Sequence, residues 1–302
     1  MADDKEQLKG QSTSKADISS PTLARRVLLP ELRRIVREAP LGTDQLGAVL
    51  GVDPSTLTRW LAGKKQKLGP RDVQSLLVAC GYDLEHPKVL QLVELSRNAS
   101  KRGLSLPWMQ KLQFDSFLDL ERDAVHLFDY EAMFVPGLLQ TTAYAEAVIR
   151  STEGDLDPLD LGRRIAIRVK RKAALMRQAD PLRLTAVLDE TVLRRGPTDR
   201  YVMRTQLEYL AETARLPNID VRVIPYAAGL HVGGETGSFV VMDFPLAAGV
   251  ENVAYSETPA RALYAEDPAE VARYRAVIDR LEGCALTRTA SLDMIERAAR
   301  AA

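Results

Sequence analysis

The sequence predicts a multidomain protein, with an N-terminal all-α domain of five helices and a C-terminal α/β domain built on a mixed sheet. The chain has 302 residues, which is long for one ordinary domain and suits two. Up to about residue 100 the apolar residues recur at helical spacing, whereas strand-like runs alternate with helical segments beyond it. Residues 21–80 carry ten Lys/Arg and five Asp/Glu, a net charge of +5, while residues 1–20 sum to −1 and the remainder to −4. A basic module on an acidic body indicates a polyanionic partner for the module alone.

Composition indicates the compartment and the domain boundaries. With 46% hydrophobic and 27% charged residues, the chain has the composition of a globular protein. No long apolar run occurs, and the first twenty residues lack the apolar centre of a signal peptide, so we expect a cytoplasmic protein without a membrane span. Cys80 and Cys284 are expected to be free thiols. The expected divisions are a disordered leader at 1–20, the helical domain at 21–100, a linker at 101–114 and the α/β domain at 115–302.

Start and stop signals define the five N-terminal helices. Residues 22–39 form the first, with Pro30 in a first-turn position, and residues 43–50 form a short second one that Gly51 ends. Asp53 is an N-cap and Pro54 a first helical residue for the third, which Gly63 stops. The fourth begins at Pro70 and closes at Gly81, and the fifth spans about residues 90–100.

The second and third helices meet the requirements of a helix-turn-helix. Gly51 supplies the left-handed turn residue, and the small Gly47 sits where the two helices cross. The inner faces are expected to hold Leu46, Leu50, Val52, Leu57 and Trp60. We therefore interpret Trp60 as a core residue and not as a residue that stacks on bases.

The opposite face of the third helix carries the residues that we expect to contact DNA. Small hydroxyl side chains let a helix sit deep in a major groove, and Arg59 can reach the O6/N7 pair of a guanine. Two lysines after the helix suit phosphates, and Thr43 lies where a helix N-terminus meets another phosphate. The predicted DNA-binding residues are Thr43, Ser55, Thr56, Thr58, Arg59, Lys64 and Lys65. The alternative interpretation is an ordinary helical hairpin with a solvated basic face.

Beyond residue 114 the sequence predicts strands and a crossover. Strand-like runs occupy 124–130, 183–188, 220–224, 238–244 and 253–257. A helix at 198–214, apolar at Met203, Leu207 and Leu210, separates the second run from the third, which predicts a βαβ unit. Asp267 followed by Pro268 caps a further helix near the end.

Both parts of the chain resemble known families. Residues 22–81 resemble the helix-turn-helix domain of xenobiotic-response-element/lambda-repressor-like regulators, although Thr43 and Leu61 stand where that family often has Gln and Glu. The blocks "FVPGLLQTTAYAEAVI", "LDETVLRR", "LPNIDVRVIPYAAGLHVGG" and "DPAEVARYRAVIDRLEGCAL" resemble a domain of unknown function found in actinobacterial WhiJ-like regulators. The resemblance implies a regulator of development or secondary metabolism, often paired with a small partner protein.

Two segments of the C-terminal domain are candidate partner-binding surfaces. Residues 163–177 hold seven Lys/Arg and no acid, and we expect Ile165, Val169, Ala173 and Met176 to form an inner stripe. The basic face is then either solvated or a contact for a partner or flanking DNA. In "FVPGLLQT", Pro136 suits a first helical position, and Phe134 with Leu139 suits a hydrophobic staple. The segment is then mainly a packing device, and it becomes a binding surface if part of the apolar cluster is exposed. The predicted partner-binding residues are Phe134, Leu138, Leu139, Arg168, Arg171 and Lys172.

Signals for catalysis and metal binding are weak. Asp189–Glu190 follow a strand, as some catalytic acids do, and the "GLHVGGETG" stretch is better interpreted as a hairpin-like connection than as a ligand loop. His86, His126 and His231 are too scattered to propose a metal site. We therefore expect no cofactor, no metal and no enzymatic activity.

These observations predict a sequence-specific transcription regulator. Its expected partners are double-stranded DNA, bound as a homodimer, and a small partner protein or small-molecule effector of the C-terminal domain. The alternatives are a ligand-binding or enzymatic α/β domain with an accessory DNA-binding head, and an adaptor that binds protein through both domains. The missing catalytic motifs argue against an enzyme, and the charge asymmetry argues against an adaptor.

Overall fold

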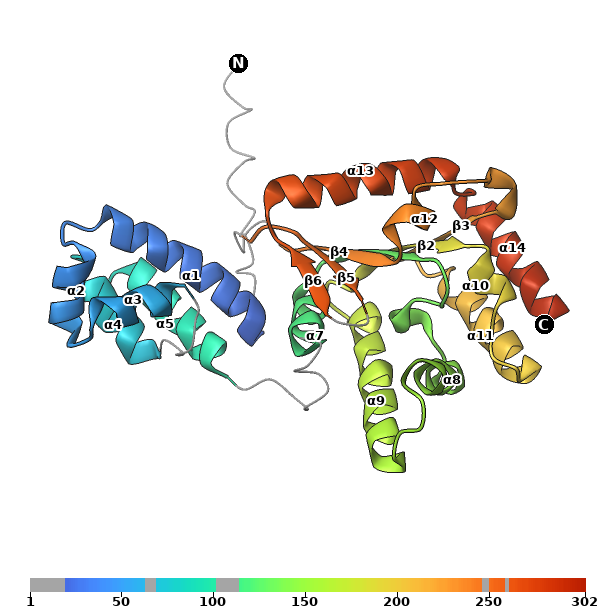
Figure 1. Cartoon of the computed structure of the whole chain (residues 1–302), viewed down its shortest axis with the longest axis horizontal. Helices are drawn as coiled ribbons and strands as arrows, with labels where there is room; N and C mark the ends of the chain where they lie inside the picture. Colours follow the sequence, from blue (N-terminus) through green and yellow to red (C-terminus); the bar gives the residue numbers. More distant parts are fainter. Residues whose placement is uncertain (1–19, 63–68, 102–113, 246–249, 259–260) are drawn as a thin grey trace, which may run out of the picture. The chain divides into compact units, whose positions relative to one another are not determined.

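The computed structural model describes residues 20–62, 69–101, 114–245, 250–258 and 261–302 (Figure 1). They form a helical unit that ends at Lys101 and a larger unit that contains Phe114–Phe244 and Glu251–Ala302. The predicted fold class, a helical domain followed by an α/β domain with a mixed sheet, is confirmed. Most of the predicted leader and linker lies outside the described residues.

The N-terminal unit contains five helices, and most of their starts are encoded locally. The Ser20 hydroxyl and the Asp53 carboxylate cap the first and third helices, and a proline occupies the first position of four of the five. Buried leucines and valines from all five helices form one core. The helices are α1 (Pro21–Glu38), α2 (Thr43–Leu50), α3 (Pro54–Leu61), α4 (Pro70–Ala79) and α5 (Pro87–Ser100).

Pro30 lies inside α1 and not in its first turn as predicted. The helix begins at Pro21, where Ser20 accepts a hydrogen bond from the Leu23 backbone N–H at 3.1 Å. Pro30 is exposed, so its ring stands on the solvent side while Leu28 and Leu32 fill the core. The packing of those leucines keeps the helix continuous across a residue that usually ends one.

The C-terminal unit is built on a six-stranded mixed sheet with the strand order β3-β2-β1-β4-β5-β6. The strands β1, β2 and β3 are parallel, and β4, β5 and β6 continue the sheet antiparallel from the other side of β1. The predicted βαβ crossover is confirmed, because β2 and β3 pair in parallel and α11 (Arg200–Thr213) lies between them in the chain. The strands are β1 (His126–Glu131), β2 (Arg183–Asp189), β3 (Ile219–Ile224), β4 (Phe239–Asp243), β5 (Val253–Glu257) and β6 (Ala262–Ala265).

Helices cover both faces of this sheet (Figure 1). The long α13 (Pro268–Cys284) lies along one face, where its Val271, Ile278 and Leu281 pack against Phe128 and Val241 of the strands. The other face is covered by α7 (Phe114–Asp123), α8 (Thr142–Glu153), α9 (Pro158–Arg171) and α11. The short α10 (Thr191–Arg194) and α12 (Gly233–Thr236) follow the carboxyl ends of β2 and β3, and α14 (Arg288–Ala301) packs on α11 and β3.

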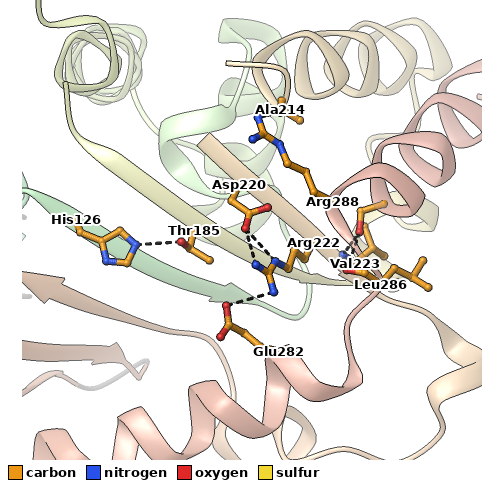
Figure 2. A network of polar contacts seen from close by, with 10 residues as sticks. His126, Thr185, Ala214, Asp220, Arg222, Val223, Glu282, Leu286 and Arg288 are labelled. Carbon is orange, nitrogen blue, oxygen red and sulfur yellow. Dashed lines mark hydrogen bonds and ion pairs between the residues drawn. The ribbon is translucent and has the colours of Figure 1, made fainter. Parts of the chain in front are cut away.

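Polar contacts attach the two last helices to the sheet (Figure 2). Arg222 on β3 forms ion pairs with Asp220 of the same strand and Glu282 of α13, at 2.8 Å and 3.6 Å. The Val223 backbone N–H donates to the buried Ser291 hydroxyl of α14 at 2.9 Å. Both nitrogens of His126 are engaged, one with Thr185 and one with Asp243, each at 3.0 Å. These contacts hold the outer strand and the C-terminal helices together.

Three local features differ from the sequence prediction. The strand β6 and the helix α14 were not predicted, because β6 is a short, half-exposed edge strand and α14 follows α13 after three residues without a glycine. The predicted hairpin-like connection around His231 is wrong, since β3 and β4 are separated by β2 and β1 in the sheet. That segment contains α12, and it crosses the carboxyl ends of the parallel strands instead of returning beside β3.

Candidate nucleic-acid interface

The joint between α2 and α3 depends on two glycines. Gly51 adopts φ 67° and ψ 28°, the left-handed conformation that a side chain disfavours. Gly47 is buried, and a methyl group added to it would lie 2.8 Å from the backbone carbonyl oxygen of Val52. Since that oxygen belongs to the backbone of the turn, it cannot move aside cheaply. The predicted roles of both glycines are confirmed.

The inner faces of α2 and α3 are apolar, as predicted. Leu46 and Leu57 are fully buried. Leu50, Val52 and Trp60 are partly buried and pack against the same core. Trp60 is thus a core residue with one exposed portion. This packing turns the opposite side of α3 toward solvent.

The solvent side of α3 carries the side chains expected to meet DNA. Ser55, Thr58 and Arg59 are exposed, whereas Thr56 is half-buried. In the free protein Arg59 lies along its own helix: its Nε donates to the Ser55 carbonyl at 3.2 Å and its NH2 to the Thr56 hydroxyl at 3.0 Å. Exposed hydrogen bonds of this kind have a small net free energy, so Arg59 is free to extend toward a base edge.

Hydrogen bonds fix the start of α2 and the end of α3, which border this face. Thr43 is exposed as the first residue of α2, and the Gln45 side chain accepts from the Gly42 backbone N–H at 3.1 Å. Arg33 of α1 donates through Nε to the Leu61 carbonyl at 2.7 Å, which ties the end of α3 to α1. The sequence gives no short-range signal for this contact, because 28 residues separate the two partners. Lys64 and Lys65, predicted phosphate contacts, lie outside the described residues.

In the C-terminal unit the "FVPGLLQT" segment is a packing device. Gln140 donates to the Val135 carbonyl at 2.7 Å, and Gln206 of α11 bridges the Leu139 carbonyl and the Thr141 N–H. Leu138 and Leu139 are 1% and 0% exposed, so in this fold they face the core and offer no surface to a partner. Phe134 is 36% exposed.

The predicted helix start at Pro136 is wrong. Residues 137–139 form one short 3-10 turn after Pro136, and α8 begins only at Thr142, with Thr141 as its cap. The exposure of Phe134 also leaves it outside the core that holds Leu139. Two hydrogen-bonding glutamines, Gln140 and Gln206, fix the segment where a helix was expected.

Three of the four residues of the predicted inner stripe, Val169, Ala173 and Met176, face solvent and Ile165 is half-buried, which corrects the sequence interpretation. Val169 is 42% and Met176 is 55% exposed, and Ala173 is exposed as well. Arginines face inward instead: Arg171 forms a bidentate pair with buried Glu121 at 2.6 and 2.7 Å, and Arg168 donates to Gln140 at 2.6 Å. Helical periodicity cannot reveal this arrangement, because the acceptors come from remote parts of the chain.

Arg168, Arg171 and Lys172 therefore have partners within the chain. The Lys172 ammonium lies 4.4 Å from the centre of the Tyr209 ring of α11, a cation–π contact. Burial lowers the pKa of Arg168 to about 10, and the nearby Arg171 acts in the same direction. Partner binding by these three residues remains a prediction, and their present contacts stabilise the fold.

Two acids near the end of β1 share this buried region. Asp129 is 6% exposed, and its Oδ1 has no hydrogen-bond partner among the residues that the structure describes. Burial, with a contribution from Glu131, raises the pKa of Asp129 well above its ordinary value. Burial also raises the pKa of Glu131 to about 7, against the opposing effect of the Ser238 hydroxyl. No sequence pattern distinguishes these two acids from other acidic residues on a strand.

Asp189 and Glu190, weighed as catalytic acids, hold the crossing segment after β3. Asp189 accepts from the Thr191 N–H at 2.7 Å and contacts His231 Nε2 at 3.2 Å. The Gly233 N–H donates to His231 Nδ1, which places the ring proton on Nε2 for Asp189. Glu190 accepts from the Tyr226 N–H at 2.9 Å and from Arg194. Each of these acidic side chains thus has a structural partner.

Among the described residues, no group of three or more His, Cys, Asp or Glu side chains is arranged to bind a metal ion. In the part of the chain that the structure describes, no helix combines the length and apolarity needed to cross a membrane.

The geometry of the N-terminal unit defines a helix-turn-helix protein, and family comparisons agree. Residues 18–78 match the family model described as "Antitoxin Xre-like helix-turn-helix domain", which indicates a regulator that binds DNA. Residues 114–297, more than half of the chain, match "Domain of unknown function (DUF5753)", and the chain belongs to that family. A search of curated proteins and a search of solved structures found no significant match.

Proposed function

We propose that this protein is a cytoplasmic, sequence-specific transcriptional regulator that reads double-stranded DNA with α3 and binds it as a homodimer. The observation that carries the proposal is the fixed α2–Gly51–α3 joint, which turns Ser55, Thr58 and Arg59 outward on one helix face. An exposed arginine among small hydroxyl residues suits a guanine in the major groove. The net charge of +5 on residues 21–80 supports binding to a polyanion.

The C-terminal domain, in this proposal, is a binding module and not an enzyme. Support comes from Asp189, Glu190 and His231, whose polar groups are occupied in holding the segment that crosses the sheet. We propose a small partner protein or a small-molecule effector as its ligand. The resemblance to WhiJ-like regulators and the word antitoxin in the name of the matched family favour a protein.

One observation favours the alternative of a ligand-binding or enzymatic α/β domain. Within the described part of the chain, Asp129 has a buried oxygen without a hydrogen-bond partner. Two residues further along β1, burial raises the pKa of Glu131 to about 7. Perturbed acids at the carboxyl end of a parallel strand are typical of functional sites as well as of structural networks. A bound metabolite that copurifies with the wild type but not with Asp129→Asn would favour this alternative.

Selection from a random duplex library with the purified full-length protein tests the proposed function. We expect a two-fold repeat whose half-sites lie about one helical turn apart, roughly 34 Å. Arg59→Ala should lose the preference at one base position of each half-site. If the full-length protein enriches no sequence at any salt concentration, the proposed function is wrong.

A further inference from the structure

The orientation of α9 reverses that of an ordinary surface helix. Arg164, Arg168 and Arg171 face inward beside the buried Leu161. Arg171 pairs with buried Glu121, whereas Arg164 pairs with Glu153, whose side chain is 36% exposed. Burying charged groups costs free energy that their ion pairs only partly return. A helix that served packing alone would bury its apolar residues and leave its arginines in water. The buried Arg171–Glu121 pair and the hydrogen bond from Arg168 to Gln140 hold this arginine-bearing face inward and leave an apolar face outward.

The consequence is an apolar stripe along the outer side of α9 and the turn that follows it. Leu159, Val169 and Met176 are 63%, 42% and 55% exposed. Smaller exposed residues fill the positions between these three, so the spacing alternates between three and four residues. The outer stripe consists of Leu159, Gly162, Ala166, Val169, Ala173 and Met176. Spacing of this kind receives the apolar side chains of a second helix.

One edge of the outer stripe is basic. Arg163 and Lys170 are exposed, seven residues apart, and therefore lie on the same side of the stripe; Arg163 also forms an exposed ion pair with Asp160 of α9 at 3.2 Å. In an antiparallel pair of two α9 helices, these positions would face their own copies, so like charges would meet. In a parallel pair they would face the side that carries Lys172. A second copy of the chain is disfavoured in both directions, and DNA does not match an apolar face.

We propose that the outer stripe of α9 binds an amphipathic helix of a partner protein, whose apolar face is bordered by Asp or Glu. The proposal deepens the proposed function, because it rests on the C-terminal domain being a partner-binding module. Acidic residues beside the apolar face of the incoming helix would pair with Arg163 and Lys170 and set its direction. The large Leu159, Val169 and Met176 would provide the anchors, and the small residues between them would allow close approach.

Binding of two synthetic helical peptides to the full-length protein tests this inference. Both carry leucines at alternating three- and four-residue spacing; one has Glu and the other Lys at all positions that border the apolar face. By fluorescence anisotropy, we expect the Glu peptide to bind at least about tenfold more tightly than the Lys peptide. The double substitution Arg163→Glu and Lys170→Glu should reverse this preference. Val169→Asp should abolish binding of both peptides.

Control variants distinguish peptide binding at the outer stripe from nonspecific peptide binding and from effects on the DNA-binding head. Tyr201→Asp changes a residue of α11 that is 68% exposed and should leave peptide binding unchanged. All variants should keep the circular dichroism spectrum and DNA affinity of the wild type, because the changed side chains are exposed. If DNA binding fails but peptide binding behaves as expected, the proposed regulator is wrong and the surface stands. Failure of the Glu peptide to bind, or equal binding of both peptides, would overturn the inference.

A photo-crosslinker at position 169 of the full-length protein, in the cells that produce it, identifies the native occupant. We expect the crosslinked peptide to be a segment of another protein with apolar residues at helical spacing and acidic neighbours. The same crosslinker at position 201 should not capture it. A crosslink to a second copy of this chain, or no product above the position-201 control, would also overturn the inference.

Discussion

Gly47 is the residue on which the DNA-binding head depends most directly. Gly47→Ala would place a methyl group 2.8 Å from the Val52 carbonyl oxygen, in the backbone of the turn. We expect the free energy of unfolding of the N-terminal unit to fall by about 1–3 kcal/mol, because the overpacked helices must separate. Thermal unfolding followed by circular dichroism measures the loss.

The same chemical change elsewhere serves as a control for Gly47. Gly283 lies in the last turn of α13, and an added methyl group meets nothing within 4 Å there. Gly283→Ala should leave the stability unchanged or raise it by less than about 1 kcal/mol. Unfolding of Gly47→Ala at the wild-type temperature would show that the helix crossing tolerates a side chain.

Glu131 makes stability depend on pH near neutrality. Burial raises the pKa of this carboxyl from 4.5 to about 7 in the folded protein, so the folded state keeps a proton that the unfolded state releases. Stability contributed by that proton is present below pH 4.5 and is lost as the pH rises to 7. Glu131→Gln should therefore melt at a higher temperature than the wild type at pH 8 and at the same temperature near pH 4.

A second carboxylate provides the comparison for Glu131. Glu208 on α11 is exposed, so Glu208→Gln should change the melting temperature by a similarly small amount at both pH values. Calorimetry at several pH values gives the change in melting temperature that each substitution causes. The difference between the two variants reports the free-energy cost of ionising the buried Glu131. A Glu131→Gln variant that is less stable than the wild type at pH 8 would show that the charged form is favourably paired.

At the scale of the element, we expect base recognition by α3 to be separable from phosphate binding by the residues after it. Arg59 is an exposed arginine in the last turn of α3, and Lys65 follows the helix in the sequence. Arg59→Ala should cost roughly 1–3 kcal/mol on the preferred sequence and relax the preference at one base position. Lys65→Ala should weaken binding to all sequences alike. Selection with each variant distinguishes the two effects, and an unchanged motif for Arg59→Ala would refute its assignment.

The inward arginines should contribute strongly to the stability of α9. Arg171→Ala would leave the carboxylate of Glu121, a residue 2% exposed, without its bidentate partner. We expect a loss of about 3–5 kcal/mol, because an unpaired buried charge remains. Arg163→Ala on the outer side, where the ion pair with Asp160 is exposed, should cost less than about 1 kcal/mol. Equal losses in denaturant unfolding would contradict the inverted orientation.

Sequence patterns predicted which segments form helices and strands better than they predicted which side of each helix is buried. The joint between α2 and α3 could be predicted because Gly47, Gly51 and Asp53 act through local backbone geometry. The same holds for α11, whose apolar spacing matches its burial. The orientation of α9 could not be predicted, because Glu121 and Gln140, which hold its arginines, lie 50 and 28 residues away in the chain. These long-range contacts turn the arginines of α9 inward, whereas helical periodicity alone predicts that they face solvent.

At the scale of the whole molecule, the net charge differs between the N-terminal head and the rest of the chain. Residues 21–80 carry +5 while the chain sums to zero, so we expect electrostatic attraction to DNA to come mainly from the head. The C-terminal unit is more than twice as long as the head. A head of this size covers only one half-site, so specific binding by the intact protein should need two copies.

Salt dependence measures how much of that binding comes from phosphates. For the full-length protein on its selected duplex, we expect the logarithm of affinity to fall linearly with the logarithm of salt concentration, with a slope near −0.9 for each neutralised phosphate. Lys65→Ala should make the slope shallower by about 1 for each bound copy, whereas Arg59→Ala, which is assigned to a base, should lower the affinity and keep the slope. Doubling the half-site in the duplex should roughly double the slope if two copies bind. A slope that stays the same on one and two half-sites would rule out the homodimer, and affinity independent of salt would rule out the phosphate contacts.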